Sequence, residues 1–123
     1  MLFNPEKKAE KWIDAAEFIY LCYYEFDDDE HGPSLMKGVK LIRREGLHTF
    51  WFSADTKGDI EELWHIPEID AFFLYGPTGS VHLTGSLDKP ECYEDTKSCQ
   101  VRFTAKECWL NTSLRRKKIP IRG

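Results

Sequence analysis

The stretch that decides the fold lies at residues 49–64 and reads TFWFSADTKGDIEELW. Its first residues are aromatic, which favours a packed β-strand. The next residues are small and polar, and they carry two hydroxyls and one cation, from Ser53, Thr56 and Lys57. After them, apolar residues recur at helical spacing, which predicts a helix over 58–65. The stretch therefore predicts a strand, a polar turn and a helix in direct succession.

A junction of this kind has a known chemical use. Free backbone N–H groups and the helix dipole point out of the start of a helix, so the junction can bind an anion. The same residues are also typical of an ordinary capped helix that follows a strand. On this stretch alone, both interpretations stay open.

Length and composition indicate a single globular domain. We expect residues 1–123 to form one domain with a real core. The 41% hydrophobic and 31% charged content is ordinary for a globular protein. A net charge of −4 argues against nucleic acid as the main partner, and no apolar run approaches the length of a membrane span. The first ten residues are charged and lack an apolar signal core, so we expect a cytoplasmic protein.

The chain up to and including the start of the central stretch predicts one helix and three strands. Apolar residues at three- and four-residue spacing predict a helix over 6–18. The run FIYLCYYEF at 18–26 is aromatic and β-branched, which predicts a buried strand. An acidic turn at 27–33 follows; it lacks the ligand spacing of a calcium loop, so we interpret it as a solvated hairpin loop. Strands are predicted at 34–43 and 48–53.

The chain after the central stretch predicts a second hairpin. Strands at 71–75 and 80–87 flank a turn of conventional composition, GPTG. Residues 91–110 are predicted to be helical, although 101–104 are equally typical of a strand. The segment from about 111 is basic, and we expect it to be a solvated or disordered tail. These elements predict an α+β, mainly β protein: an antiparallel barrel with flanking helices.

Cysteines and histidines give no catalytic or metal-binding pattern. The four cysteines, Cys22, Cys92, Cys99 and Cys108, form no C-x-x-C pair, and we expect reduced thiols. Two strand histidines, His48 and His82, can share a face, but no third ligand is evident, so no metal is predicted. No serine or cysteine has the setting of an activated nucleophile, so no catalytic side chain is predicted.

Several motifs carry a family resemblance by their order. They are HGP at 31–33, FWFS at 50–53, DIEELWHIPEI at 59–69, AFFLYG at 71–76 and VHLTGSL at 81–87. This ordered set resembles the pyridoxamine 5′-phosphate oxidase-like family, the flavin-binding split barrels, and is most similar to the branch called general stress proteins. The resemblance covers about residues 7–110, with 88–109 resembling a further helix that contains a Trp.

The resemblance implies a homodimeric split barrel that binds FMN between its subunits, with deazaflavin less favoured. The implied activity is hydride or electron transfer to a small molecule, carried by the cofactor. The flavin ring would lie against the strand 35–39 and beside 50–53. The implied cofactor-binding residues are Met36, Lys37, Gly38, Phe52, Ser53, Thr56 and Lys57.

Departures from the family pattern at Met36 and Asp59 favour an alternative. The family's two phosphate-binding basic positions fall near Met36 and Asp59, with Lys37 and Lys57 close by. The predicted elements also stop before the final strands that many members use to close the barrel. The alternative is therefore a split barrel without flavin, acting as a binding or stress-related module. An unrelated small β-barrel with an aromatic ligand pocket is the third hypothesis.

Overall fold

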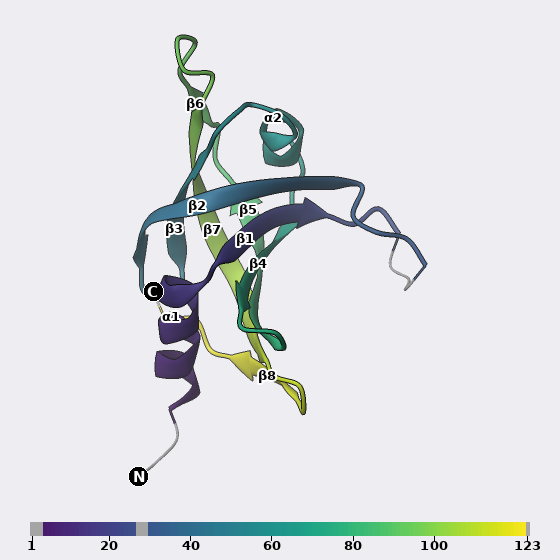
Figure 1. The fold of residues 1–123 in the computed structure, drawn as a ribbon, viewed down its shortest axis with the longest axis vertical. Helices are drawn as coiled ribbons and strands as arrows, with labels where there is room; N and C mark the ends of the chain where they lie inside the picture. Colours follow the sequence, from purple (N-terminus) through teal and green to yellow (C-terminus); the bar gives the residue numbers. More distant parts are fainter. Residues whose placement is uncertain (1–3, 27–29, 123) are drawn as a thin grey trace.

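A computed structural model describes residues 4–26 and 30–122. Its elements are α1 (Pro5–Ala15), β1 (Phe18–Tyr23), β2 (Leu35–Glu45), β3 (Thr49–Ala54), α2 (Ile60–Trp64), β4 (Ile69–Tyr75), β5 (Gly79–Leu87), β6 (Glu91–Cys92), β7 (Cys99–Asn111) and β8 (Arg116–Ile119). Figure 1 shows their arrangement. Part of the predicted acidic turn, 27–29, lies outside the described residues. Neither of the two helices seen in the described ranges is long and apolar enough to cross a membrane.

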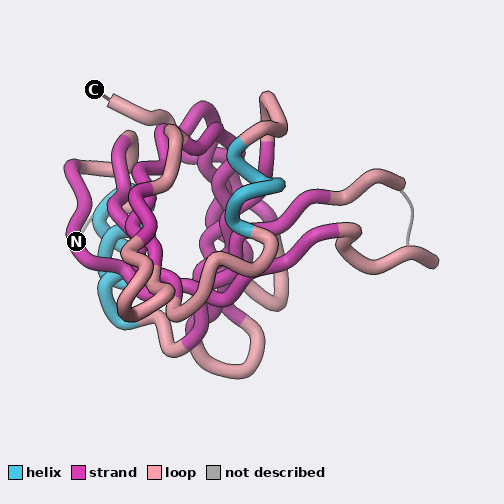
Figure 2. The backbone as a smooth tube through the Cα atoms, turned by 90° about the horizontal axis from the view of Figure 1, so that it is seen from above, coloured by secondary structure: helices cyan, strands magenta, loops and turns pink. Residues whose placement is uncertain are grey.

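Six strands form a closed antiparallel barrel, in the order β3-β2-β1-β4-β5-β7. The pairing of β3 with β7 closes it, with Phe50 opposite Phe103. Figure 2 shows the strands as a ring seen from above. The closed barrel confirms the predicted fold class.

Alternation along the strands places the core inside this ring. Every second residue is buried along β3 and along β5 from Val81 onward, as expected for strands with one face inward. Four fully buried phenylalanines meet at the centre, with ring centroids 5.6–6.3 Å apart between neighbours: Phe50, Phe52, Phe73 and Phe103. Burial of such large apolar side chains is the main source of stability.

One end of the barrel is covered by α1, whose N-terminus is capped by Asn4. The Asn4 side chain accepts a hydrogen bond from the Lys7 N–H at 3.2 Å. Ile13 is 1% exposed and packs into the core. Trp12 stacks on Tyr75 with a centroid distance of 4.9 Å. This end is therefore closed by an apolar helix face.

The other end is covered by α2, which has five residues. Ile60 and Leu63 are fully buried against the core. In Figure 1 the two helices lie at opposite ends of the barrel. The polar turn predicted before the helix therefore lies at the α2 end.

The helix predicted over 91–110 is wrong, because these residues form β6 and β7. Buried residues in β7 alternate as 99, 101 and 103, and then resume at 108 and 110. The shift coincides with a bulge in the pairing with β5, between Thr84 and Gly85. A bulge adds a residue to one strand and breaks the period of two. The broken alternation resembled a helical pattern.

The predicted absence of barrel-closing strands is also wrong, because β7 closes the barrel and β8 extends it. The basic segment pairs with β7 from Asn111 opposite Arg116 to Cys108 opposite Ile119. Ile119 is 1% exposed, and the Arg116 guanidinium lies 4.6 Å from the centroid of the Trp109 ring. The segment is therefore part of the sheet and not a solvated tail.

The prediction of four reduced thiols is wrong for two of them. Cys92 and Cys99 form a disulfide between the register partners of β6 and β7. Cys22 and Cys108 are free and buried. Burial raises the pKa of both thiols to about 12, so neither is an activated nucleophile at neutral pH.

Candidate functional site

A polar corner lies where β3 runs into α2, and it comprises residues 56–59 together with Lys37 of β2. Lys37 Nζ donates a hydrogen bond to Thr56 Oγ1 at 2.6 Å. Gly58 has a φ of +38°, and a Cβ there would lie 2.9 Å from Lys37 Nζ. A side chain at this position would be strained and would displace the lysine. The corner thus brings together Lys37 and Thr56, two of the residues implied by the resemblance.

Carboxylates already engage part of this corner. Asp59 precedes α2 but does not cap it; its Oδ2 accepts the Met36 N–H at 3.3 Å. Lys57 Nζ lies 3.8 Å from Glu61 Oε1, one helical turn away. The Ile60 N–H donates to the Lys57 carbonyl at 2.8 Å. The start of α2 is thus less open to an anion than the sequence predicted.

A pocket of about 340 Å³ lies on the outside of the barrel, over β1, β2 and β3. Gly38 and Ser53, two of the residues implied by the resemblance, both line it. The register places Tyr20 opposite Gly38, and Lys40 opposite Ser53. A Cβ at Gly38 would lie 3.7 Å from the Tyr20 ring. Glycine keeps this part of the strand surface open next to an aromatic side chain.

The two implied residues that remain are Phe52 and Met36, and neither lines the outer pocket. Phe52 is fully buried in the core, so its side chain is not available to a ligand. Met36 is half exposed, at 50%, and stands two residues before Gly38 on β2. The seven residues thus divide between the outer pocket, the polar corner and the core.

Sequence reasoning missed several residues that line the outer pocket. Phe18, Tyr20 and Lys40 are among them. A signal was present for Lys40, because a residue two positions after Gly38 lies on the same face of a strand. The pocket also contains two carboxylates, from Glu17 and Asp55. Its chemistry is therefore aromatic with groups of both charges.

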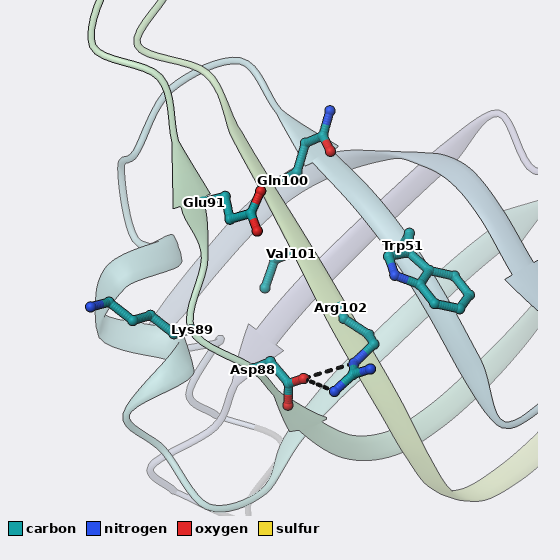
Figure 3. A pocket seen from close by; sticks show the side chains of 7 residues that line it. All are labelled: Trp51, Asp88, Lys89, Glu91, Gln100, Val101 and Arg102. Atoms are coloured by element: carbon teal, nitrogen blue, oxygen red, sulfur yellow. Dashed lines mark hydrogen bonds and ion pairs between the residues drawn. The ribbon is translucent and has the colours of Figure 1, made fainter.

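A second pocket of about 360 Å³ lies over β3, β6 and β7 (Figure 3). Arg102 turns toward Asp88 there, and its Nε donates to Asp88 Oδ2 at 2.7 Å. Trp51 stands on the opposite side, with the Arg43 guanidinium 3.6 Å from its ring centroid. Asp88 neutralises Arg102 and Glu91 adds a second carboxylate to the lining, so this pocket is the weaker candidate for an anion.

A third cluster surrounds His82 on the outside of the barrel. The His82 ring lies between Phe72 and Trp109, with centroid distances of 4.4 and 5.3 Å. Arg116 has only donors, so its contact of 2.9 Å assigns His82 Nδ1 as the acceptor. Nε2–H then donates to Asp70 at 2.6 Å. These contacts account for both ring nitrogens.

The two strand histidines do not meet at a metal site. His48 Nδ1 lies 2.7 Å from Thr49 Oγ1, and His82 is held by Asp70 and Arg116. Over residues 4–26 and 30–122, no group of three His, Cys, Asp or Glu side chains is placed to hold a metal ion.

Comparison with solved structures identifies the fold. A Clostridium acetobutylicum protein of the pyridoxinephosphate oxidase family, related to general stress protein 26 of Bacillus subtilis, superposes with a TM-score of 0.72. It is 14% identical, and the alignment covers 92% of each chain. A NimC/NimA family protein of the same organism has a TM-score of 0.59 and 14% identity over 95% of each chain. No family model and no curated protein matches the sequence.

These likenesses define the class of protein by its architecture. The chain is a split barrel, as the motif order predicted, and its backbone is similar to those two proteins over nearly its whole length. At this level of identity the likeness concerns the fold.

Proposed function

We propose that the protein binds FMN in the outer pocket and the polar corner, and acts as a flavin-dependent oxidoreductase on a small molecule. The observation that carries the proposal is the register, which places Gly38 and Ser53 in one pocket with Phe18 and Tyr20. A cavity of about 340 Å³ is within the usual range for small-molecule sites. The motif order of the sequence supports the same conclusion.

The residues present fit a flavin phosphate and a flat ring. Ser53 and Lys40 supply donors, and the open strand surface at Gly38 suits a planar group. Lys37, Thr56 and Lys57 supply two cations and a hydroxyl at the polar corner. When bound, FMN would supply the hydride or electron transfer. The chain's own residues bind it, orient it and exclude water from its ring.

We further propose that the flavin lies between the subunits of a cytoplasmic homodimer. The exposed apolar side chains of β1 and β4 support this, because Phe18 (56% exposed) stands opposite Leu74 (36% exposed) beside the pocket. A second copy would bury this face and complete the pocket. Light scattering on the purified protein tests the dimer, and cell fractionation tests the location.

The absorbance spectrum from the near ultraviolet to the blue, before and after FMN addition, tests the flavin. We expect a bound flavin spectrum, and Gly38→Val should abolish binding because its side chain would occupy the open surface. Ser86→Val is the matched control, since Ser86 is on β5 away from the pocket. A colourless protein that does not bind added FMN would overturn the proposal.

A second function, a split barrel without flavin that acts as a binding or stress-related module, is favoured by one observation. Asp59 Oδ2 accepts a hydrogen bond from the Met36 N–H at 3.3 Å, and Glu61 Oε1 lies 3.8 Å from Lys57 Nζ. Carboxylates therefore already bind the donors that a phosphate would need. Lys57→Ala separates the two functions. A large loss of FMN affinity supports the flavoprotein, whereas no FMN affinity before or after the change supports the module.

A further inference from the structure

The loop between β6 and β7 meets the polar corner at a further cavity, separate from the two pockets described above. Thr56 and Lys57 form one wall of this cavity, and Glu94 and Lys97 form the other; its volume is about 330 Å³. We call it the corner pocket. Two of its residues belong to the loop 93–98, which lies far along the chain from Thr56 and Lys57. The chain thus brings a cation to the corner from a segment that the sequence analysis predicted to be helical.

The loop holds Lys97 in an unusual backbone conformation. Lys97 has a φ of +58°, a value that residues other than glycine seldom adopt. The Tyr93 N–H donates to the Ser98 carbonyl at 2.8 Å, and Thr96 Oγ1 lies 2.7 Å from Ser98 Oγ. Backbone strain at one residue persists only where the surrounding contacts enforce it. These turn contacts therefore fix the backbone at Lys97.

Lys97 differs from the other two lysines of the corner. Lys37 donates to Thr56, and Lys57 lies beside Glu61. Lys97 forms no ion pair within the described parts of the chain, 4–26 and 30–122, although Glu94 lines the same cavity. It is the cation at this corner whose charge is available to a ligand.

The Cys92–Cys99 disulfide closes the loop that carries Lys97. β6 has two residues, and its pairing with β7 consists of Glu91 opposite Gln100 and Cys92 opposite Cys99. So short a pairing is marginal without the covalent link. The position of Lys97 thus depends on the bridge.

We propose that the corner pocket binds a phosphate group, that Lys97 supplies a cation that the position of Asp59 lacks, and that the Cys92–Cys99 disulfide keeps Lys97 in position. The proposal rests on the proposed function only in taking the phosphate to be that of FMN. Reduction by a dithiol breaks the Sγ–Sγ bond and gives two protein thiols, while the dithiol is oxidised to its own disulfide. The redox state of the cysteine pair then sets the affinity for the phosphate.

Titration with inorganic phosphate tests the site directly on the full chain, followed by the backbone amide shifts of Thr56, Lys57 and Lys97. We expect saturable shifts, and binding about fivefold weaker in Lys97→Gln, the size expected for one exposed charge contact. Lys89→Gln is the matched control, an exposed lysine that lies outside the corner pocket. Equal phosphate affinity in Lys97→Gln and the unchanged protein would overturn the proposal.

Reduction and double substitution test the redox part. Dithiothreitol treatment and Cys92→Ser/Cys99→Ser should each weaken phosphate binding as much as Lys97→Gln, with the barrel amide spectrum retained. Unchanged affinity after reduction would refute the dependence on the disulfide.

FMN and riboflavin titrations distinguish the two proposals. If Lys97 binds phosphate but neither flavin binds, the flavoprotein proposal fails and the phosphate site stands. If FMN binds equally to Lys97→Gln and the unchanged protein, the Lys97 proposal fails and the flavoprotein stands.

Discussion

The two ends of the barrel are closed in different ways. At one end, α1 has eleven residues and closes the barrel with buried Ala9 and Ile13 and with the stacked Trp12. At the other, α2 has five residues and stands next to the polar corner and the disulfide-closed loop. Apolar packing stabilises the α1 end. At the α2 end, hydrogen bonds and the Cys92–Cys99 disulfide add to apolar packing. Polar groups available to a ligand therefore accumulate at the α2 end.

The largest expected effect is at the α1 end, where Ile13→Ala removes a side chain that is 1% exposed. We expect the free energy of unfolding to fall by about 3 kcal/mol, the usual cost of such a cavity. Urea denaturation measures it. Lys11→Ala, on the exposed face of the same helix, should change stability by less than about 0.5 kcal/mol. A similar loss in both variants would show that α1 contributes no specific packing.

The next effect is at the α2 end. Cys92→Ser/Cys99→Ser should lower the free energy of unfolding by about 2–3 kcal/mol, since the bridge restricts the unfolded chain across a separation of seven residues. Denaturation under non-reducing conditions measures this loss. Dithiothreitol should destabilise the unchanged protein and leave the double variant as it was. If the unchanged protein also resists dithiothreitol, the loop is held by its other contacts.

Overpacking at the α1 end should cost somewhat less. A Cβ at Gly79 would lie 2.7 Å from the Trp12 ring and 2.8 Å from the Tyr75 carbonyl oxygen. Gly79→Ala should therefore destabilise the protein by about 1–2 kcal/mol. In a double-mutant cycle, Trp12→Leu should recover part of this loss, because the ring contact is relieved. Gly32→Ala, where no atom lies within 4 Å of a Cβ, is the neutral control.

The smallest effect concerns an ion pair that joins α1 to β2. The hydrogen bond from Arg44, whose Nε lies 2.8 Å from Asp14 Oδ1, lowers the pKa of Asp14 below its usual 3.8. A lowered pKa in the folded state contributes stability above 3.8, and that stability is lost as the pH falls through the folded value. Because Asp14 is half exposed, we expect at most about 1 kcal/mol. Denaturation of Asp14→Asn across this range should show a weaker pH dependence; an unchanged profile would contradict the assignment.

The barrel could be predicted from sequence where local pattern and pairing agree. In β3 and β5 the alternation is regular, so the strands at 48–53 and 80–87 were predicted nearly to the residue. β7 was not, because its bulge opposite Gly85 reverses which residues face inward. That reversal depends on how β7 pairs with β5, and the sequence of β7 alone does not show this pairing.

The candidate site was predicted in part for a similar reason. Gly38, Ser53 and Thr56 come from strands and a turn whose order carries the resemblance, and they line the outer pocket or the corner. Lys97 comes from a loop whose position is set by the pairing of β6 with β7 and by the disulfide. No local pattern indicates that this loop meets the polar corner.

The closure of the barrel through β7 also bears on how the chain folds. Phe50 pairs with Phe103 across nearly half of the sequence, so the ring cannot close until β7 has been synthesised. Until then β3 has a free edge, on which another chain can add a strand. Such non-local pairing is slow to form. On the ribosome, the nascent chain therefore passes through an open sheet that is vulnerable to aggregation until β7 has been translated.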